Sequence, residues 1–167
     1  MQLNYLNKPH FENGAIKSIS QVLEEHGIKN PLICTDPGLA NIGMSDMIRN
    51  LLSNELSPSF YEDTPANPTE QAVNDALEIY KQNGCDGVVG FGGGSSMDLA
   101  KTVALMANHE GNVVDYSVNE GGVGKINQTM PMIAIPTTSG TGSEVSLGAV
   151  IIMNAVSYTH LRAHETA

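Results

Sequence analysis

The sequence has no tryptophan, only two cysteines and few basic residues. Lysine and arginine together number 8 against 18 aspartates and glutamates, so the formal net charge is -10. A protein of this charge repels nucleic-acid phosphates and anionic lipid, and its basic residues do not cluster. We therefore expect neither nucleic-acid binding nor membrane binding, and an anionic ligand would have to be held by backbone N–H groups.

Long apolar runs and a targeting leader are also missing. No run approaches the roughly 18 apolar residues that a membrane helix needs, and the first residues lack the basic-then-apolar order of a secretory signal. This pattern predicts a soluble, cytoplasmic protein. Cys34 and Cys85 lack metal-site spacing, so we interpret them as buried, reduced thiols. The scattered His10, His26 and His109 are predicted not to bind metal.

What the sequence does contain is a regular alternation of strand-like and helix-like segments. Its 167 residues, 41% of them hydrophobic, are enough for one core. Strands are expected at 31–35, 59–62, 87–91 and 132–135, with more apolar β-type sequence at 147–153. Helices are expected between 14 and 27, from 36 to 52, from 69 to 84 and from 95 to about 108, and 109–128 is interpreted as a surface excursion. The fold class is therefore α/β, a Rossmann-like layered domain with a mainly parallel sheet.

Two glycine-rich turns, at 92–95 and 139–143, each follow one of these apolar strands. The carboxyl ends of parallel strands lie at the same edge of a sheet, so both turns are expected there, where ligands bind. Gly93 and Gly94 let a ligand approach the backbone closely, and Ser95 is expected to open a helix whose free N–H groups favour an anion. Our working hypothesis is that a nucleotide pyrophosphate binds at 92–95.

The acidic and basic residues near the first turn have alternative interpretations. Asp98 has capping-box spacing to Ser95 and is expected to reach back to its N–H, while Lys101 is expected to be solvated. The acid that a ribose needs could be Asp115, by its spacing, or Asp36, by its position at a strand end. Asp36 is also a candidate N-cap of the following helix.

The second turn is rich in hydroxyl side chains, which suit ribose, amide or phosphate groups. They are Thr137, Thr138, Thr141, Ser143 and Ser146. The first turn differs from the usual dinucleotide fingerprint, because Ser95 stands at the third glycine position. No Gly-Lys-Ser/Thr follows, so it is not a Walker loop either.

The two glycine-rich segments resemble the signatures of a known family. Gly-Gly-Gly-Ser-Ser-Met-Asp-Leu-Ala-Lys at 92–101 and Pro-Thr-Thr-Ser-Gly-Thr-Gly-Ser-Glu-Val at 136–145 are similar to those of the iron-containing (group III) alcohol dehydrogenases. Secondary matches are Phe11 with Gly14, Thr35-Asp36 and Asn67-Pro68-Thr69. The resemblance covers residues 3–153.

The resemblance implies an amino-terminal α/β cofactor domain, followed by an all-helical domain that holds a divalent metal, usually Fe²⁺. The complete enzyme would move hydride between NAD(P) and a small alcohol or aldehyde. Gly93, Gly94 and Ser95 would hold the pyrophosphate, Asp36 the adenosine ribose, and Thr137, Thr138 and Ser146 the nicotinamide side, with Asn67 nearby. We include Asp98, Thr141 and Ser143 in this site. The Asp36 carboxylate would favour NAD over NADP by repelling a 2′-phosphate.

The resemblance ends near residue 154. Residues 155–167 match none of the family's metal-binding segment, and Val156, not an acid, stands four positions before His160. We interpret 1–154 as the dinucleotide-binding domain and 155–167 as a foreign or disordered tail, and expect the metal only in a full-length enzyme. The 167-residue chain is then expected to bind nucleotide weakly, without turnover.

Two other interpretations stay open. The loop at 139–144 also resembles one that wraps a phosphomonoester, as in a sugar-phosphate binding or isomerase domain. Alternatively, the chain is an inactive fragment whose exposed apolar surface drives association into a homo-oligomer.

Overall fold

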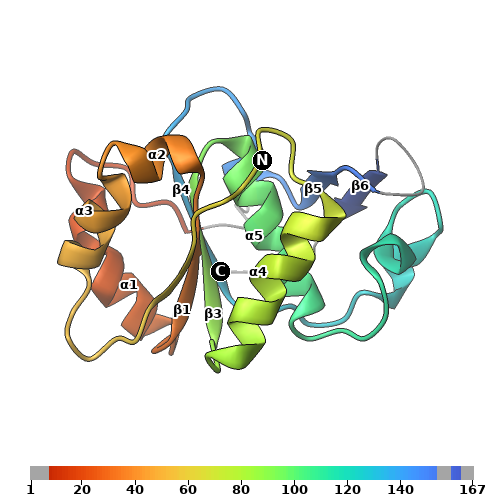
Figure 1. The fold of residues 1–167 in the computed structure, drawn as a ribbon, viewed down its shortest axis with the longest axis horizontal. Coiled ribbons are helices and arrows are strands. Elements are labelled where there is room, and N and C mark those ends of the chain that lie inside the picture. Colours follow the sequence, from red (N-terminus) through yellow and green to blue (C-terminus); the bar gives the residue numbers. More distant parts are fainter. Residues whose placement is uncertain (1–7, 154–158, 163–167) are drawn as a thin grey trace, which may run out of the picture.

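A computed structural model describes residues 8–153 and 159–162 (Figure 1). Four parallel strands form the central sheet in the order β2-β1-β3-β4. They are β1 (Pro31–Cys34), β2 (Ser59–Tyr61), β3 (Gly87–Gly92) and β4 (Met132–Pro136). Every residue of β1 and β3 is buried, as expected for the inner strands of a parallel sheet covered on both faces. The predicted α/β class is confirmed.

Helices cover both faces of the sheet, as Figure 1 shows, with α1 to α3 on one side and α4 and α5 on the other. Their bounds are α1 (Ile19–Glu25, preceded by the 3₁₀ turn η1, Ala15–Ser18), α2 (Pro37–Asn41), α3 (Met44–Leu51), α4 (Glu70–Gln82) and α5 (Gly94–Met106). Alternate strand residues point to opposite faces, so Ile33 packs with α1 and α3 while Leu32 packs with α4 and α5. Each face therefore has its own apolar core.

Three predicted elements differ from the structure. The helix expected from 36 to 52 is two helices, because Gly43 takes a left-handed φ of 81° between α2 and α3. The helix expected to open at Ser95 begins at Gly94, with Gly93 as its N-cap. The surface excursion at 109–128 contains two 3₁₀ turns, η2 (Val113–Tyr116) and η3 (Gly122–Lys125).

The apolar sequence at 147–153 lies outside the parallel sheet. It forms β5 (Gly148–Ile151), which follows the 3₁₀ turn η4 (Ser143–Val145) and pairs antiparallel with β6 (Thr159–Arg162). Of the tail predicted at 155–167, residues 155–158 and 163–167 lie outside the described residues, so this assignment stays a prediction. Within the described ranges, no helix is both long and apolar enough to cross a membrane.

Close packing of α5 on β3 fixes the position of the first glycine turn. A Cβ at Gly90 would lie 3.0 Å from the Met97 Cα and 3.1 Å from the Ala100 Cβ. The helix therefore lies against the bare backbone of the strand. Its amino terminus is held directly beyond the carboxyl end of β3.

Candidate functional site

A cavity of about 430 Å³ opens at the carboxyl ends of β1, β3 and β4. A residue just beyond the end of each strand lines it: Asp36 after β1, Gly93 after β3 and Thr137 after β4. The cavity is lined by Asp36, Pro37, Gly38, Leu39, Thr64, Pro65, Ala66, Gly93, Ser95, Ser96, Thr137 and Thr138. This is the sheet edge at which doubly wound α/β proteins bind ligands.

The two glycine-rich turns meet at this edge, as predicted. Gly92 pairs with Pro136 in the sheet, and the Thr137 N–H donates to the Gly92 carbonyl at 2.9 Å. A Cβ at Gly93 would lie 3.6 Å from the Thr138 Oγ1. The second turn therefore packs directly over the first.

Gly92 brings Asp36 and the start of α5 close together. Its φ is 150°, and a Cβ there would lie 2.5 Å from the Ser96 Oγ and 3.3 Å from the Asp36 Oδ2. No other residue type fits this position without displacing Ser96. Gly92, the first glycine of the signature, is thus required by packing as well as by backbone conformation.

Asp36 lies at the cavity wall and caps α2, which confirms the N-cap interpretation. Its Oδ1 accepts the Leu39 N–H at 3.1 Å. Asp115, the alternative suggested by spacing, accepts the Asn112 N–H at 2.8 Å within the capping box of η2 and is not among the cavity residues. The structure therefore favours Asp36 as the acid of the site.

An anionic ligand fits the chemistry of this cavity. The N-cap of α5 is Gly93, which has no side chain, so the first N–H groups of this 13-residue helix have no capping acceptor. Ser96 and Thr64 also line the cavity, and their hydroxyl oxygens are buried without a hydrogen-bond partner in the described structure. Buried hydroxyls are normally paired, so these two are candidate contacts for phosphate or ribose oxygens.

Sequence reasoning missed Ser96 and Thr64 as candidate site residues. A signal for Ser96 exists, because it is the third residue of a helix that follows a glycine turn. Thr64 precedes Pro65 in a turn-rich segment, and nothing in its local sequence indicates that it faces the strand ends. Ser95, which was predicted, also lines the cavity. Its hydroxyl donates to the Ala66 carbonyl at 2.5 Å and so links the start of α5 to the 64–66 segment of the cavity wall.

The structure does not bring every predicted residue into the cavity. Asp36, Gly93, Ser95, Thr137 and Thr138 line it together. The predicted residues that are not among those lining it are Asn67, Gly94, Asp98, Thr141, Ser143 and Ser146. Ser146 lies on a neighbouring cavity of about 880 Å³ between residues 8–26 and β4, and Thr137 lines both cavities.

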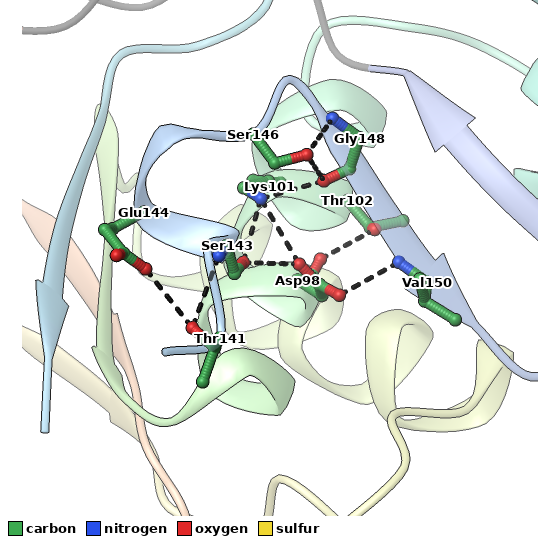
Figure 2. Close-up of polar contacts among 9 residues, drawn as sticks. All are labelled: Asp98, Lys101, Thr102, Thr141, Ser143, Glu144, Ser146, Gly148 and Val150. Atoms are coloured by element: carbon green, nitrogen blue, oxygen red, sulfur yellow. Dashed lines mark hydrogen bonds and ion pairs between the residues drawn. The ribbon is translucent and has the colours of Figure 1, made fainter. Parts of the chain in front are cut away.

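Asp98 and Lys101 behave differently from the prediction (Figure 2). Asp98 does not cap Ser95. Its carboxylate accepts the Ser143 hydroxyl at 2.6 Å, the Val150 N–H at 3.0 Å and the Lys101 ammonium at 3.2 Å. The capping box was wrong because the Asp98 side chain finds partners that lie far from it in the sequence.

Lys101 was expected to be solvated, but it is 7% exposed. Its ammonium also donates to the Ser143 Oγ at 2.9 Å and to the Gly148 carbonyl at 2.8 Å. Burial lowers the pKa of Lys101, and the neighbouring Asp98 carboxylate acts in the opposite direction. Lys101 is therefore a buried side chain of α5 that binds the loop, and not a surface charge.

These features define a Rossmann-like α/β domain with its site at the carboxyl edge of the sheet. The chain belongs to the iron-containing alcohol dehydrogenase family, whose model matches residues 7–164. It is 43% identical over 151 residues to a 4-hydroxybutyrate dehydrogenase of Cupriavidus necator, a match that covers 90% of this chain and 39% of that protein. It is 40% identical over 139 residues to a choline dehydrogenase of Bacillus subtilis, with coverage of 83% and 35%.

Solved structures agree with the sequence relatives. The NADH-dependent butanol dehydrogenase A of Thermotoga maritima superposes with a TM-score of 0.87 at 25% identity, covering 98% of this chain and 41% of that one. A sulfoacetaldehyde reductase of Bifidobacterium kashiwanohense, solved in complex with NAD⁺, gives 0.79 at 28% identity, covering 90% and 39%. The chain thus spans about two fifths of the length of these relatives.

The family name implies a metal, which the described part of the chain does not fit. Within residues 8–153 and 159–162, no group of three or more His, Cys, Asp or Glu side chains is placed to hold a metal ion. Cys34 and Cys85 are buried free thiols, as predicted. Among the described residues, the cavity at the strand ends is a candidate nucleotide site, and no candidate metal site is found.

Proposed function

We propose that this chain is the cofactor-binding half of an NAD-linked alcohol dehydrogenase that acts on a small alcohol or aldehyde. The main support is one cavity in which an uncapped helix start, a strand-end carboxylate and unpaired buried hydroxyls converge. The N–H groups that follow Gly93 would bind the pyrophosphate, and Ser96 and Thr64 would donate to phosphate or ribose oxygens. Asp36 would accept from the adenosine ribose.

The larger neighbouring cavity supports a site for the other end of the dinucleotide. Thr137 lies between the two cavities, and Ser146 lines the larger one together with apolar residues of β4. We assign the nicotinamide to this side, with Thr137, Thr138 and Ser146 orienting it. The nicotinamide would supply the hydride chemistry, while this chain's residues bind the cofactor and hold it in position. The mixed polar and apolar lining suits a ring with an amide group.

We propose NAD as the cofactor in preference to NADP, because the Asp36 carboxylate would repel a 2′-phosphate. The sulfoacetaldehyde reductase relative supports NAD through its NAD⁺ complex. A divalent metal, usually Fe²⁺, belongs to our proposal only for a full-length enzyme. The cytoplasmic location and a homo-oligomeric state stay predictions.

The test is calorimetry of the 167-residue chain with NADH, NADPH and a hexose phosphate. We expect NADH to bind most tightly, NADPH more weakly, and the hexose phosphate without measurable heat. Tight hexose-phosphate binding would replace the proposal with a sugar-phosphate function, and no binding of any ligand would indicate an inert fragment.

A turnover assay on the same chain tests the second part of the proposal. We expect no alcohol-dependent formation of NADH when Fe²⁺, NAD⁺ and a series of primary alcohols are supplied, because the family's metal-binding pattern has no match after residue 154. Measurable NADH formation by the purified chain would overturn this expectation.

A further inference from the structure

Asp98, Lys101 and Ser143 join three segments that are distant in the sequence (Figure 2). Asp98 and Lys101 lie one turn apart on α5, Ser143 begins η4 in the second glycine-rich loop, and the backbone groups of Gly148 and Val150 belong to β5. Each of the five partners is bonded within 2.6 to 3.2 Å. The network therefore fastens the loop and β5 to the helix that starts at the cavity.

The two charges are almost completely withdrawn from solvent. The side chain of Lys101 is 8% exposed and that of Asp98 is 15% exposed. Desolvation makes such a pair a weak source of overall stability, but removing one member leaves the other charge buried and unpaired. A buried pair of this kind restricts geometry, because both charges need their partners.

The hydrogen bonds of Lys101 leave no donor for a ligand. An ammonium has three N–H groups, and Lys101 has three acceptors: Asp98, Ser143 and the Gly148 carbonyl. Ser143 completes the arrangement, since it accepts from Lys101 and donates to Asp98. Lys101 also lines the larger cavity, but with its three N–H groups paired it is suited to act through the loop and not by donating to a nucleotide.

The loop that they hold covers the start of α5. A Cβ at Gly94 would lie 3.5 Å from the Thr141 Cβ and 4.0 Å from the Ser143 Cβ. Thr138, three residues before Thr141, lines the cavity beside Gly93. Displacement of Ser143 would consequently move the hydroxyl side chains of the loop relative to the helix start.

We propose that Asp98 and Lys101 form a positioning pair that holds the 138–146 loop over Gly93 and Gly94, and so sets the affinity for ligands long enough to reach that loop. The inference rests on the proposed function for its choice of ligand. On that function, ADP would occupy the cavity at the helix start and Asp36, whereas NADH would extend further, to Ser146 in the larger cavity. The pair should therefore matter for NADH and not for ADP.

Binding of both ligands to charge-removing variants tests the proposal. We expect Asp98→Asn and Lys101→Met each to weaken NADH about tenfold and ADP less than about twofold. The double variant should lose less NADH affinity than the two single losses multiplied together, because no unpaired buried charge remains. Matched controls are Asp75→Asn and Lys81→Met, which remove exposed charges from α4 and should leave both affinities unchanged.

Equal losses of NADH and ADP would overturn the positioning role, and so would purely multiplicative effects in the double variant. If a charge variant does not fold, as judged by circular dichroism, Ser143→Ala replaces it. This variant removes only the bridging hydroxyl and should weaken NADH by a smaller factor than the charge variants, with ADP again unaffected.

A second measurement needs no ligand and separates this inference from the proposed function. Amide hydrogen exchange of residues 139–147 should be about tenfold faster in Asp98→Asn than in the original chain, with the α4 amides unchanged. Unchanged loop exchange would overturn the pair's role. If the original chain bound neither NADH nor ADP, the proposed function would fail while the exchange result still decided whether the pair holds the loop.

Discussion

At the scale of single residues, Asp36 combines a structural role with the recognition role that we propose for it, in one carboxylate. One oxygen caps α2 through Leu39, and the other faces the point where Gly92 passes close to Ser96. The cap aims the side chain at the cavity, because it fixes the carboxylate relative to the strand end. Sequence spacing did not decide between Asp36 and Asp115, whereas the hydrogen bond to Leu39 fixes the Asp36 carboxylate at the cavity wall.

Substituting Asp36 separates the two roles. Asp36→Ala should lower the free energy of unfolding by about 1 kcal/mol through loss of the cap. It should also weaken NADH and narrow the preference for NADH over NADPH, because the repulsion of the 2′-phosphate is gone. Calorimetric dissociation constants for both cofactors give the ratio.

Asp36→Asn is the matched control for this prediction. It keeps an oxygen that can cap α2 and loses only the charge, so stability should be retained while the cofactor ratio narrows. If the ratio stayed the same in both variants, Asp36 would not be the residue that distinguishes the cofactors.

At the scale of elements, the packing of α5 on β3 determines where the first turn lies. Gly90→Val places two methyl groups where a Cβ alone would already be 3.0 Å from the Met97 Cα. We expect the free energy of unfolding to fall by about 1 to 3 kcal/mol as the helix is pushed outward. Urea denaturation followed by circular dichroism measures this change.

Gly124→Val is the control, because a Cβ at Gly124 would meet no atom within 4 Å. Its effect should stay within about 0.5 kcal/mol. Equal stability of the two variants would show that the helix can move away from β3 without cost.

Local sequence predicts the elements well where burial alone decides them. β1 and β3 are continuous apolar runs because both faces of the sheet are covered, and Thr69 caps α4 through the Ala72 N–H at 3.2 Å, as its position suggests. The motifs likewise predict that both glycine turns lie at one edge. For Asp98 the local pattern fails, because its partner Ser143 lies 45 positions away.

The hydroxyls of Ser96 and Thr64 could not be predicted for a related reason. Their burial without partners depends on how three loops converge, and neither residue has a distinctive neighbour in the sequence. The β5 segment shows the same limit, since its apolar pattern fits either the parallel sheet or the antiparallel pair in which it lies. Tertiary contacts decide these cases.

At the scale of the whole molecule, buried tyrosine and cysteine side chains make the free energy of unfolding sensitive to alkaline pH. Burial raises the pKa of Tyr61 from 10.0 to about 12, with Asp75 and Asp63 adding to the effect. Burial also raises the pKa of Cys34, Tyr80 and Cys85. The unfolded chain then loses these protons first as the pH rises, so unfolding becomes easier.

The free energy of unfolding should therefore be highest below the ordinary pKa values of these groups and fall as the pH rises from about 9 toward 12. Tyr61 alone accounts for at most about 3 kcal/mol of the loss, at about 1.4 kcal/mol for each pKa unit. The lowered pKa of Lys101 makes the free energy of unfolding rise with pH. This is one group against the four tyrosine and cysteine side chains, so the fall is expected to dominate. Denaturation series at several pH values measure the curve.

Tyr61→Phe checks the assignment. This variant should lose less stability than the original chain between pH 10 and 12, because one of the four titrating groups is gone. An original chain whose free energy of unfolding stayed level up to pH 11 would contradict the prediction.

The cavity at the strand ends has a property that concerns the solution around it. None of the described residues that line it is a lysine or arginine, although Lys8 and Lys101 line the larger cavity, and the molecule as a whole carries a formal net charge of -10. Dissolved ions weaken attraction between opposite charges, but here they would mainly weaken the repulsion between the protein and an incoming pyrophosphate. NADH affinity should therefore stay level or rise between about 20 and 500 mM NaCl, whereas a site built from basic side chains would lose affinity. A nucleotide site made of amides and hydroxyls can in this way keep its ligand in strong electrolyte.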